Sequence, residues 1–305
     1  KKKYKIFGLD NLNNYYDIKL KKNRLKILQK YKKNFSFNKL DLKNKNKLIN
    51  FFKINKFDIV VHLAAQAGVR YSILNPSTYF DNNVMGFFNV LESCREIKTK
   101  NLIYASTSSV YGNVKKFPVS ETDPTDKPMS FYAASKKTNE ILAYSYSNIY
   151  KLRTTGLRFF TIYGPYGRPD MALFKFVKNI LQKKPIDLYN KGNHTRDFTY
   201  IDDVISAIVS LVDKKFIINQ KIPYKVFNVG NGKPIHLKDF LKLIQTKLSI
   251  KAKINNFPFQ QGDVIKTHAN INKINLFVKS SKTPVAKGIA NFVDWYMEYF
   301  KIKKK

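Results

Sequence analysis

The stretch from Phe57 to Ala65 reads FDIVVHLAA, and it is the part of this sequence that decides the fold. It is a short, almost unbroken apolar run with β-branched residues at its centre. Such a run is typical of a strand that is buried on both faces of a parallel sheet. We expect His62 within it to be a core histidine rather than a catalytic one. Strand and helix patterns alternate around this run, which predicts a doubly wound parallel α/β sheet.

The elements expected on either side are defined by their residue ranges. Further strands are expected at Tyr4–Leu9, Phe35–Leu40, Asn101–Ala105 and Arg153–Phe160. Helices are expected at Ile18–Tyr31, at Lys45–Ile54, from Asn75-Pro76 through Glu96, and at Ser130–Tyr150. After about residue 160 the pattern is interrupted by loops rich in Pro and Gly. We therefore expect a sheet domain over 1–160 and a smaller domain over 161–305, with part of 191–230 returning to the sheet.

Composition narrows the classes of function. The chain has 305 residues and a net charge of +35, but its lysines are spread along the whole sequence. This spread favours a solvated surface over a nucleic-acid partner, although a polyanion partner stays open. No apolar run approaches the roughly 18 residues that span a membrane. A single cysteine, Cys94, allows no internal disulfide or zinc cluster, and the other candidate ligands His194, His236 and His268 are scattered. We expect no metal and a cytoplasmic location.

A candidate catalytic pair lies in YAASK, Tyr132 to Lys136. Residues four apart on a helix share one face, so the ammonium group would lie near the phenol and lower its pKa from about 10. A tyrosine tuned in this way can accept a proton near neutral pH. The plainer interpretation is an ordinary amphipathic helix. Thr107 favours the catalytic one, because it places a hydroxyl at the end of an expected strand upstream in YASTSSVYG.

Several motifs in order carry a family resemblance: HLAAQAGVRYS, DNNVMG, YASTSSVYG, YAASKKTNE, LRFFTIYGPYGRPDMALF and RDFTYIDD. Together they resemble the NAD-dependent epimerase/dehydratase group of the extended short-chain dehydrogenase/reductase superfamily, and within it the 4-epimerases that act on UDP-glucuronate. The resemblance implies a Rossmann fold with an NAD-binding first domain and a substrate domain after it. It also implies NAD as cofactor, a UDP-sugar as substrate, and a homodimer.

Matched positions imply roles for particular residues. The implied catalytic set is Thr107, Tyr132 and Lys136. Besides Tyr132 and Lys136, the positions implied to bind NAD are Asp10, Asn11, Asp41, Leu42, Leu63, Ala64, Ala65, Gln66, Asn82 and Phe160. Those implied to bind the UDP-sugar are Ser108, Ser109, Thr161, Arg168, Arg196, Gln260 and Asp263. Gln261 departs from the family, which usually has proline there.

Some of these residues also have a plainer interpretation. Asp10 and Asp41 could be turn or helix-cap residues, which is the commonest use of an aspartate at a strand end. Arg168 and Arg196 could be solvated, as many basic residues of this chain must be. The six motifs in the expected order nevertheless favour the functional roles.

The segment Thr107-Ser108-Ser109 reduces the number of reactions that this chain is expected to catalyse. Dehydratases and decarboxylases of this group carry a carboxylate in the same segment, and none is present here. We therefore expect oxidation at C4 of the sugar followed by return of the hydride to the other face, which is epimerisation. A UDP-glucose 4-epimerase, a dehydratase or decarboxylase, and a catalytically incompetent fragment remain as alternatives.

The fragment alternative rests on Asp10, which ends an expected strand with no glycine-rich loop upstream of it. In this fold such an acid follows the glycine-rich loop by about 20 residues. The expectation is therefore a sheet that lacks its first strand, its glycine-rich loop and its first helix. The strands Tyr4–Leu9 and Asn101–Ala105 should then have exposed edges, and NAD should bind poorly.

Overall fold

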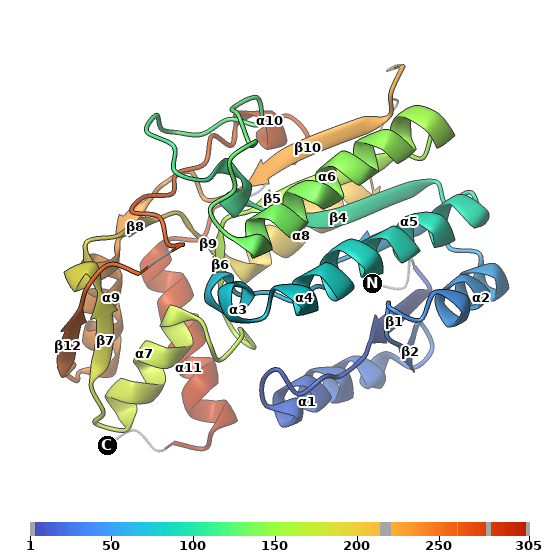
Figure 1. Ribbon diagram of the computed structural model, residues 1–305. Coiled ribbons are helices and arrows are strands. Elements are labelled where there is room, and N and C mark those ends of the chain that lie inside the picture. Colours follow the sequence, from blue (N-terminus) through green and yellow to red (C-terminus); the bar gives the residue numbers. More distant parts are fainter. Residues whose placement is uncertain (1–3, 214–220, 261, 279–281, 303–305) are drawn as a thin grey trace.

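The computed structural model describes residues 4–213, 221–260, 262–278 and 282–302. At its centre is a parallel four-stranded sheet with strand order β10–β5–β4–β3 (Figure 1). Its strands are β3 (Ile59–His62), β4 (Asn101–Thr107), β5 (Thr154–Phe159) and β10 (Tyr224–Val229). The parallel α/β fold predicted from the sequence is confirmed, although β3 ends at His62 and the residues after it form a loop.

A second parallel sheet contains only β1 (Ile6–Asp10) and β2 (Phe35–Lys39). Among the residues that the structure describes, no ladder joins β1 to β3. The expectation of an exposed edge at Asn101–Ala105 is wrong, because β4 pairs with β3 on one side and with β5 on the other. The outer strand on this side of the four-stranded sheet is β3, where Val61 is 38% exposed.

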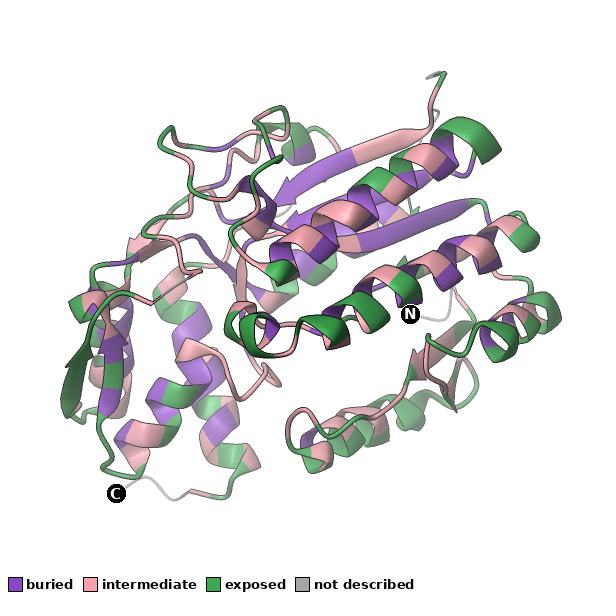
Figure 2. Cartoon of the chain, viewed as in Figure 1, coloured by how far each residue is buried: buried purple, intermediate pink, exposed green. Residues whose placement is uncertain are grey.

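Helices cover both faces of the four-stranded sheet (Figure 1). On one face lie α5 (Gly86–Glu96) and α6 (Phe131–Tyr150), and on the other lies α8 (Ile201–Asp213). The buried clusters of the two faces are centred on Leu91, Leu102 and Ala143 and on Ile103, Leu157 and Val204, respectively. Because alternate residues of β4 enter opposite clusters, this strand is buried on both faces, as Figure 2 shows.

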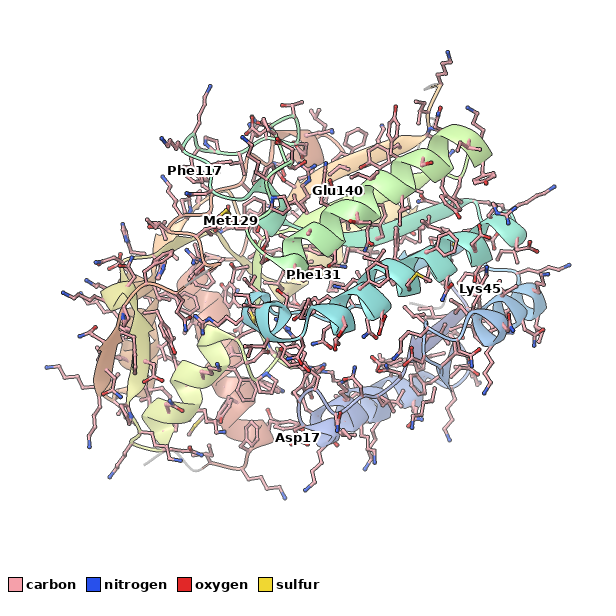
Figure 3. All side chains as sticks on the ribbon, in the orientation of Figure 1. Asp17, Lys45, Phe117, Met129, Phe131 and Glu140 are labelled. Atoms are coloured by element: carbon pink, nitrogen blue, oxygen red, sulfur yellow. The ribbon has the colours of Figure 1, made fainter. Side chains whose placement is uncertain are left out.

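Polar caps fix where several helices begin. Ser130 accepts a hydrogen bond from the Ala133 amide at 3.1 Å, so α6 begins where the sequence predicted. Asp17 caps α1 (Ile18–Leu28), which continues as the 3₁₀ turn η1 (Gln29–Tyr31), and Asn44 caps α2 (Lys45–Asn55). Asp17 can be located in Figure 3.

The single long helix predicted from Asn75-Pro76 through Glu96 is wrong in its middle. The segment consists of α4 (Pro76–Tyr79), the π-helical turn η2 (Phe80–Met85) and α5, and α3 (Val69–Leu74) precedes it. Within the π turn, Asn83 is buried and forms two hydrogen bonds with the backbone of Gln66. A contact with a residue distant along the chain thus inserts an extra residue into the helical turn, as is common at functional sites.

The second half of the chain forms its own buried cluster (Figure 1). It is built mainly from α7 (Ala172–Leu181), β7 (Ile186–Tyr189), α9 (Leu237–Leu248) and α11 (Val285–Tyr299), and the exposed strand β12 (Ile254–Phe257) pairs with β7. The remaining short elements are β6 (Thr161–Tyr163), β8 (Thr195–Arg196), β9 (Phe198–Tyr200), β11 (Ile235–His236), α10 (Asn272–Asn275) and the 3₁₀ turns η3 (Ser108–Tyr111) and η4 (Asn190–Gly192). Strand β10 and α8 return to the sheet.

His62 ends β3 in the core, with its ring 5.3 Å from that of Phe87. It is 5% exposed, and its Nε2 atom has no hydrogen-bond partner in the described part of the chain. Burial, together with the nearby charge of Lys136, lowers the pKa of His62 to about 3. The imidazole is therefore neutral in the folded protein at any pH near neutrality.

This buried histidine should make the protein acid-sensitive. Below pH 6.5 His62 of the unfolded chain binds a proton, whereas His62 of the folded chain stays neutral down to about pH 3. The folded protein therefore loses stability as the pH falls from 6.5 toward 3. Between pH 6.5 and 4.5 the loss from this residue should be about 2–3 kcal/mol. Urea unfolding at both pH values should show a correspondingly smaller loss for His62→Gln. The exposed control His236→Gln should behave like the unmodified protein, and equal losses in all three would contradict the argument.

Candidate active site

The end of β4 and the first turn of α6 bring the predicted catalytic hydroxyls together. Thr107 is 6% exposed, and its Oγ1 lies 3.2 Å from the Ser109 Oγ and also accepts a hydrogen bond from the Ser109 amide. A hydrogen bond from Thr107 reaches Tyr132 and lowers the pKa of that phenol. Ser108 and Ser109 are partly exposed and so can meet a ligand.

Lys136 lies one helical turn after Tyr132 and is 2% exposed. Its Nζ donates a hydrogen bond of 2.8 Å to the carbonyl oxygen of Ala105 on β4. Burial lowers the pKa of this ammonium group to about 8. The lysine thus ties α6 to β4 immediately before the strand end that carries Thr107.

The electrostatics at Tyr132 differ from the expectation that Lys136 lowers its pKa. The pKa of Tyr132 is raised, mainly by burial, and the groups that oppose this rise are Thr107 and Arg168. Lys136 is not among the groups that shift it, because its ammonium group is directed at the strand carbonyl. The ring of Tyr132 packs edge to face against that of Tyr79, a buried residue that sequence reasoning did not identify.

Asn83, the neighbour of the predicted Asn82, is a buried amide that joins two segments of the site. Asn82 donates to the Thr78 carbonyl of its own helical segment. Asn83 donates to the Gln66 carbonyl at 3.0 Å and accepts from the Gln66 amide at 2.7 Å, and its Nδ2 also lies 3.0 Å from the Ser135 Oγ. It therefore clamps the loop after β3 to the helix that carries Tyr132.

The polar residues predicted at the ends of β1 and β2 do converge. Asn11 donates a hydrogen bond of 3.1 Å to the Asp41 carboxylate. Asp10 accepts from the Leu12 amide at 2.6 Å and Asp41 from the Lys43 amide at 2.9 Å, so both acids also shape their turns. The functional and the turn interpretations are both compatible with this geometry, and an exposed Asp10 carboxylate can accept bonds from a ribose.

The other residues predicted to bind the cofactor lie around the same edge. Leu63, Ala64 and Ala65 are exposed just beyond β3, which leaves room for a ligand beside the strand end. The Leu42 carbonyl accepts a bond from Asn89 on α5. Phe160 is 4% exposed and belongs to the cluster of Val110, Val119 and Ala269. Together with the acids after β1 and β2, the open loop after β3 fits the dinucleotide that the resemblance implies.

Arg196 and Asp263, both predicted to bind substrate, form an ion pair in the second half of the chain. Arg196 Nη2 lies 2.7 Å from the Asp263 Oδ1, and Nη1 donates to the carbonyls of Ile265 and Thr195. Gln260, in the same loop, has a buried Oε1 atom without a hydrogen-bond partner among the described residues. Gln261 lies outside the described residues.

Arg168 comes from the YGPYGRPD loop and acts electrostatically on Tyr132. Its Nη1 lies 3.5 Å from the Asp170 carboxylate but forms no hydrogen bond within the described residues. Tyr15, from the loop after β1, donates a long bond of 3.4 Å to the same carboxylate. Thr161 begins β6 at the end of the preceding strand and is partly exposed. Residues from both halves of the chain thus meet at the site.

The described part of the chain contains neither a cluster of metal ligands nor a helix suited to a membrane. Over these residues there is no group of three or more His, Cys, Asp or Glu side chains that could hold a metal ion. Nor does any helix of these residues have the length and apolarity to cross a membrane.

Comparisons with known proteins place this geometry in context. A family model described as the NAD dependent epimerase/dehydratase family matches residues 1–230. Protein CapI from Staphylococcus aureus is 48% identical over 97% of this chain and 92% of its own length. A protein from Rhizobium meliloti (strain 1021) named "Probable UDP-glucuronate 4-epimerase" is 40% identical over 97% of this chain and 91% of its own length.

A solved structure agrees with the fold. The UDP-glucuronic acid 4-epimerase from Bacillus cereus, in complex with UDP-glucuronic acid and NAD, superposes with a TM-score of 0.90. It is 32% identical, and the match covers 97% of this chain and 92% of that one. The parallel α/β architecture is therefore shared over nearly the whole chain.

Proposed function

The chain belongs to the NAD dependent epimerase/dehydratase family, and from this premise we propose that it is a nucleotide-sugar 4-epimerase that interconverts UDP-glucuronate and UDP-galacturonate. The observation that carries the proposal is the cluster at the end of β4, where Thr107 meets Tyr132 beside the anchored Lys136. The residues that follow Thr107 are the hydroxyls Ser108 and Ser109, so this strand end offers no carboxylate for an elimination.

The chain's own residues supply the proton chemistry. Tyr132 accepts the proton of the sugar 4-hydroxyl, and Thr107 shares that proton through its hydrogen bond to the phenol. NAD, when bound, would supply the acceptor and then the donor of the C4 hydride. Arg168 lowers the pKa of Tyr132 and therefore favours the phenolate. Asp10, Asn11, Asp41 and the loop Leu63–Ala65 would hold the cofactor.

Substrate recognition follows from the anionic groups of a UDP-sugar acid. Ser108, Ser109 and Thr161 can donate hydrogen bonds to the 5-carboxylate and restrain its loss as carbon dioxide. Arg196, with Gln260 and Asp263 beside it, is assigned to the diphosphate end. We assign the sheet domain to NAD and most of 161–305 to the UDP-sugar, and a cytoplasmic location, which the single buried Cys94 supports.

The substrate assignment predicts one product pattern. The protein should convert UDP-glucuronate to UDP-galacturonate without releasing carbon dioxide, as followed by chromatography of the nucleotide sugars. UDP-glucose should be a poorer substrate, because it lacks the carboxylate that the hydroxyls bind. Ser109→Glu should raise the share of decarboxylated product. Faster turnover of UDP-glucose, or a pentose product from the unmodified protein, would contradict the proposal.

The base assignment predicts a loss confined to the chemical step. Tyr132→Phe removes the proton acceptor and should lower kcat about 10²- to 10⁴-fold while binding of UDP-glucuronate stays similar. Steady-state kinetics and calorimetric titration would measure the two quantities. Tyr150→Phe, at the exposed far end of the same helix, is the matched control and should keep its activity. A Tyr132→Phe protein of undiminished kcat would exclude the phenol as base.

We further propose that the protein is a homodimer that pairs through α5 and α6, which lie side by side on the outer face. Large apolar side chains are exposed on α6 and on the π turn that leads into α5: Phe80, Met85, Phe131, Ile141 and Ile149. Such a patch is typical of a protein interface.

Charge placed on this face should separate the subunits. Ile141→Lys should shift the mass measured by light scattering from dimer to monomer. Ile205→Lys, on the exposed side of α8 beyond the opposite face of the sheet, should leave the mass unchanged. A monomeric unmodified protein, or a dimeric Ile141→Lys protein, would refute this arrangement.

A further inference from the structure

A buried ion pair lies directly behind the candidate active site. Arg158 on β5 binds Glu140 on α6 through two hydrogen bonds, from Nε to Oε1 at 2.9 Å and from Nη2 to Oε2 at 2.8 Å. Arg158 is 4% exposed and Glu140 only 2%. Arg158 also donates to the Glu121 carbonyl and lies over the ring of Tyr111. Nothing in the reaction described above uses this pair.

The pair reaches the strand that carries the catalytic threonine. Ser106 donates a hydrogen bond of 2.6 Å to the Glu140 Oε1, and Ser106 is the cross-strand partner of Arg158. Glu140 is therefore bound to β4 and to β5 at two residues that lie opposite each other in the sheet. The next residue of β4 is Thr107, so the attachment lies one residue from the reacting hydroxyl.

The spacing of residues along α6 connects Glu140 with the predicted catalytic residues. Tyr132, Lys136 and Glu140 follow one another at intervals of four, so they form one line on the face of the helix. Lys136 is bound to Ala105 and Glu140 to Ser106, which are consecutive residues of β4. Two bonds to adjacent residues of β4 fix both the position of α6 along the strand and its rotation about its own axis.

We propose that Glu140, oriented by Arg158, is a positioning residue that fixes the place of α6 on β4 and so the approach of Tyr132 to Thr107. The inference rests on the proposed function, since it assigns a part in the same reaction. Figure 3 labels Glu140 midway along α6. Its carboxylate touches neither reacting group and acts through the helix and the strand alone.

Stability alone is a weak explanation for the pair. A buried ion pair can often be replaced by apolar side chains of similar size without loss of stability, whereas removing one partner leaves a costly unpaired charge. Apolar side chains form no directional bonds, so they would fill the space without fixing the register of the helix. A stabilising role and a positioning role of the pair can therefore be separated by experiment.

The surroundings make such substitutions practicable. Glu140 and Arg158 line an open cleft of about 550 Å³ between α6 and β10, whose other walls include Lys137, Tyr144 and Lys225. Thr107, Tyr132 and Lys136 are not part of its lining.

The experiment compares three variants with the unmodified protein on UDP-glucuronate. Glu140→Gln removes the charge, and the double variant Glu140→Met with Arg158→Met removes the pair while keeping the space filled. Glu92→Gln is the matched control, because Glu92 also binds an arginine, Arg95, through two bonds and contacts α6 at Tyr146, away from β4. The measurements are kcat, KM, thermal midpoint and amide hydrogen exchange of residues 131–136 in the cofactor-free protein.

In the double variant the thermal midpoint should return to within a few degrees of the unmodified value. Its kcat should nevertheless stay roughly 10- to 100-fold lower, because a displacement of about 1 Å has an effect of this size. Its KM should change less than about threefold, and the first turn of α6 should exchange faster. Glu140→Gln should lose both stability and kcat, while Glu92→Gln should keep kcat within about twofold.

A double variant that recovers stability and kcat together would show that the pair is only structural, and the inference would fall. If the double variant stays unstable, kcat and the amide hydrogen exchange of residues 131–136 are measured well below its thermal midpoint. Values equal to those of the unmodified protein would again overturn the inference. Failure of the unmodified protein to epimerise UDP-glucuronate would refute the proposed function instead, and the exchange measurement would still test the placement of α6.

Discussion

The buried ammonium group of Lys136 is the constraint on which the site depends. Removing a charged amine from water is costly, and the fall of its pKa from 10.5 to about 8 expresses that cost. One hydrogen bond to the Ala105 carbonyl compensates part of it, and that bond forms only if α6 lies directly on β4. Placing the lysine therefore places the first turn of the helix, and with it Tyr132, over the strand end at Thr107.

A second constraint acts on the other side of this helix. Asn83 satisfies both the amide and the carbonyl of Gln66 and reaches Ser135 in the turn between Tyr132 and Lys136. A single buried side chain thus holds the loop after β3, the π turn and α6 in one arrangement. Because buried polar groups are expensive when unpaired, each of these three segments stabilises the position of the others.

The parts of the fold that were predicted from sequence are those governed by local pattern. The apolar run Phe57–Ala65 located β3, although the strand itself covers only Ile59–His62, and α6 lies within the helix predicted over Ser130–Tyr150. Contacts between distant residues could not be predicted in this way. Within the π turn Asn83 bonds to Gln66, which is 17 residues earlier in the chain, whereas the neighbouring Asn82 bonds to Thr78 of its own helical segment.

The same limit applies to the electrostatics of the site. Spacing of four correctly predicts that Tyr132 and Lys136 share a face, but it does not say where the ammonium group points. The β4 carbonyl attracts it, and the pKa of Tyr132 is lowered by Thr107 and by Arg168, which is 36 residues further along the chain. Only the folded arrangement of both halves brings that arginine to the phenol.

The two predicted substrate arginines differ in what they can still bind. Arg196 already donates to Asp263 and to two backbone carbonyls, so its guanidinium group is fixed and its remaining donors define one direction. Arg168 has a loose contact with Asp170 at 3.5 Å, a bond of 3.2 Å from Nη2 to the sulfur of Met171, and a buried Nη1 without a hydrogen bond in the described structure. A guanidinium group gains most from a carboxylate when its donors are free to form two parallel bonds. Under the proposed substrate assignment, an entering acidic sugar would therefore change the partners of Arg168 more than those of Arg196.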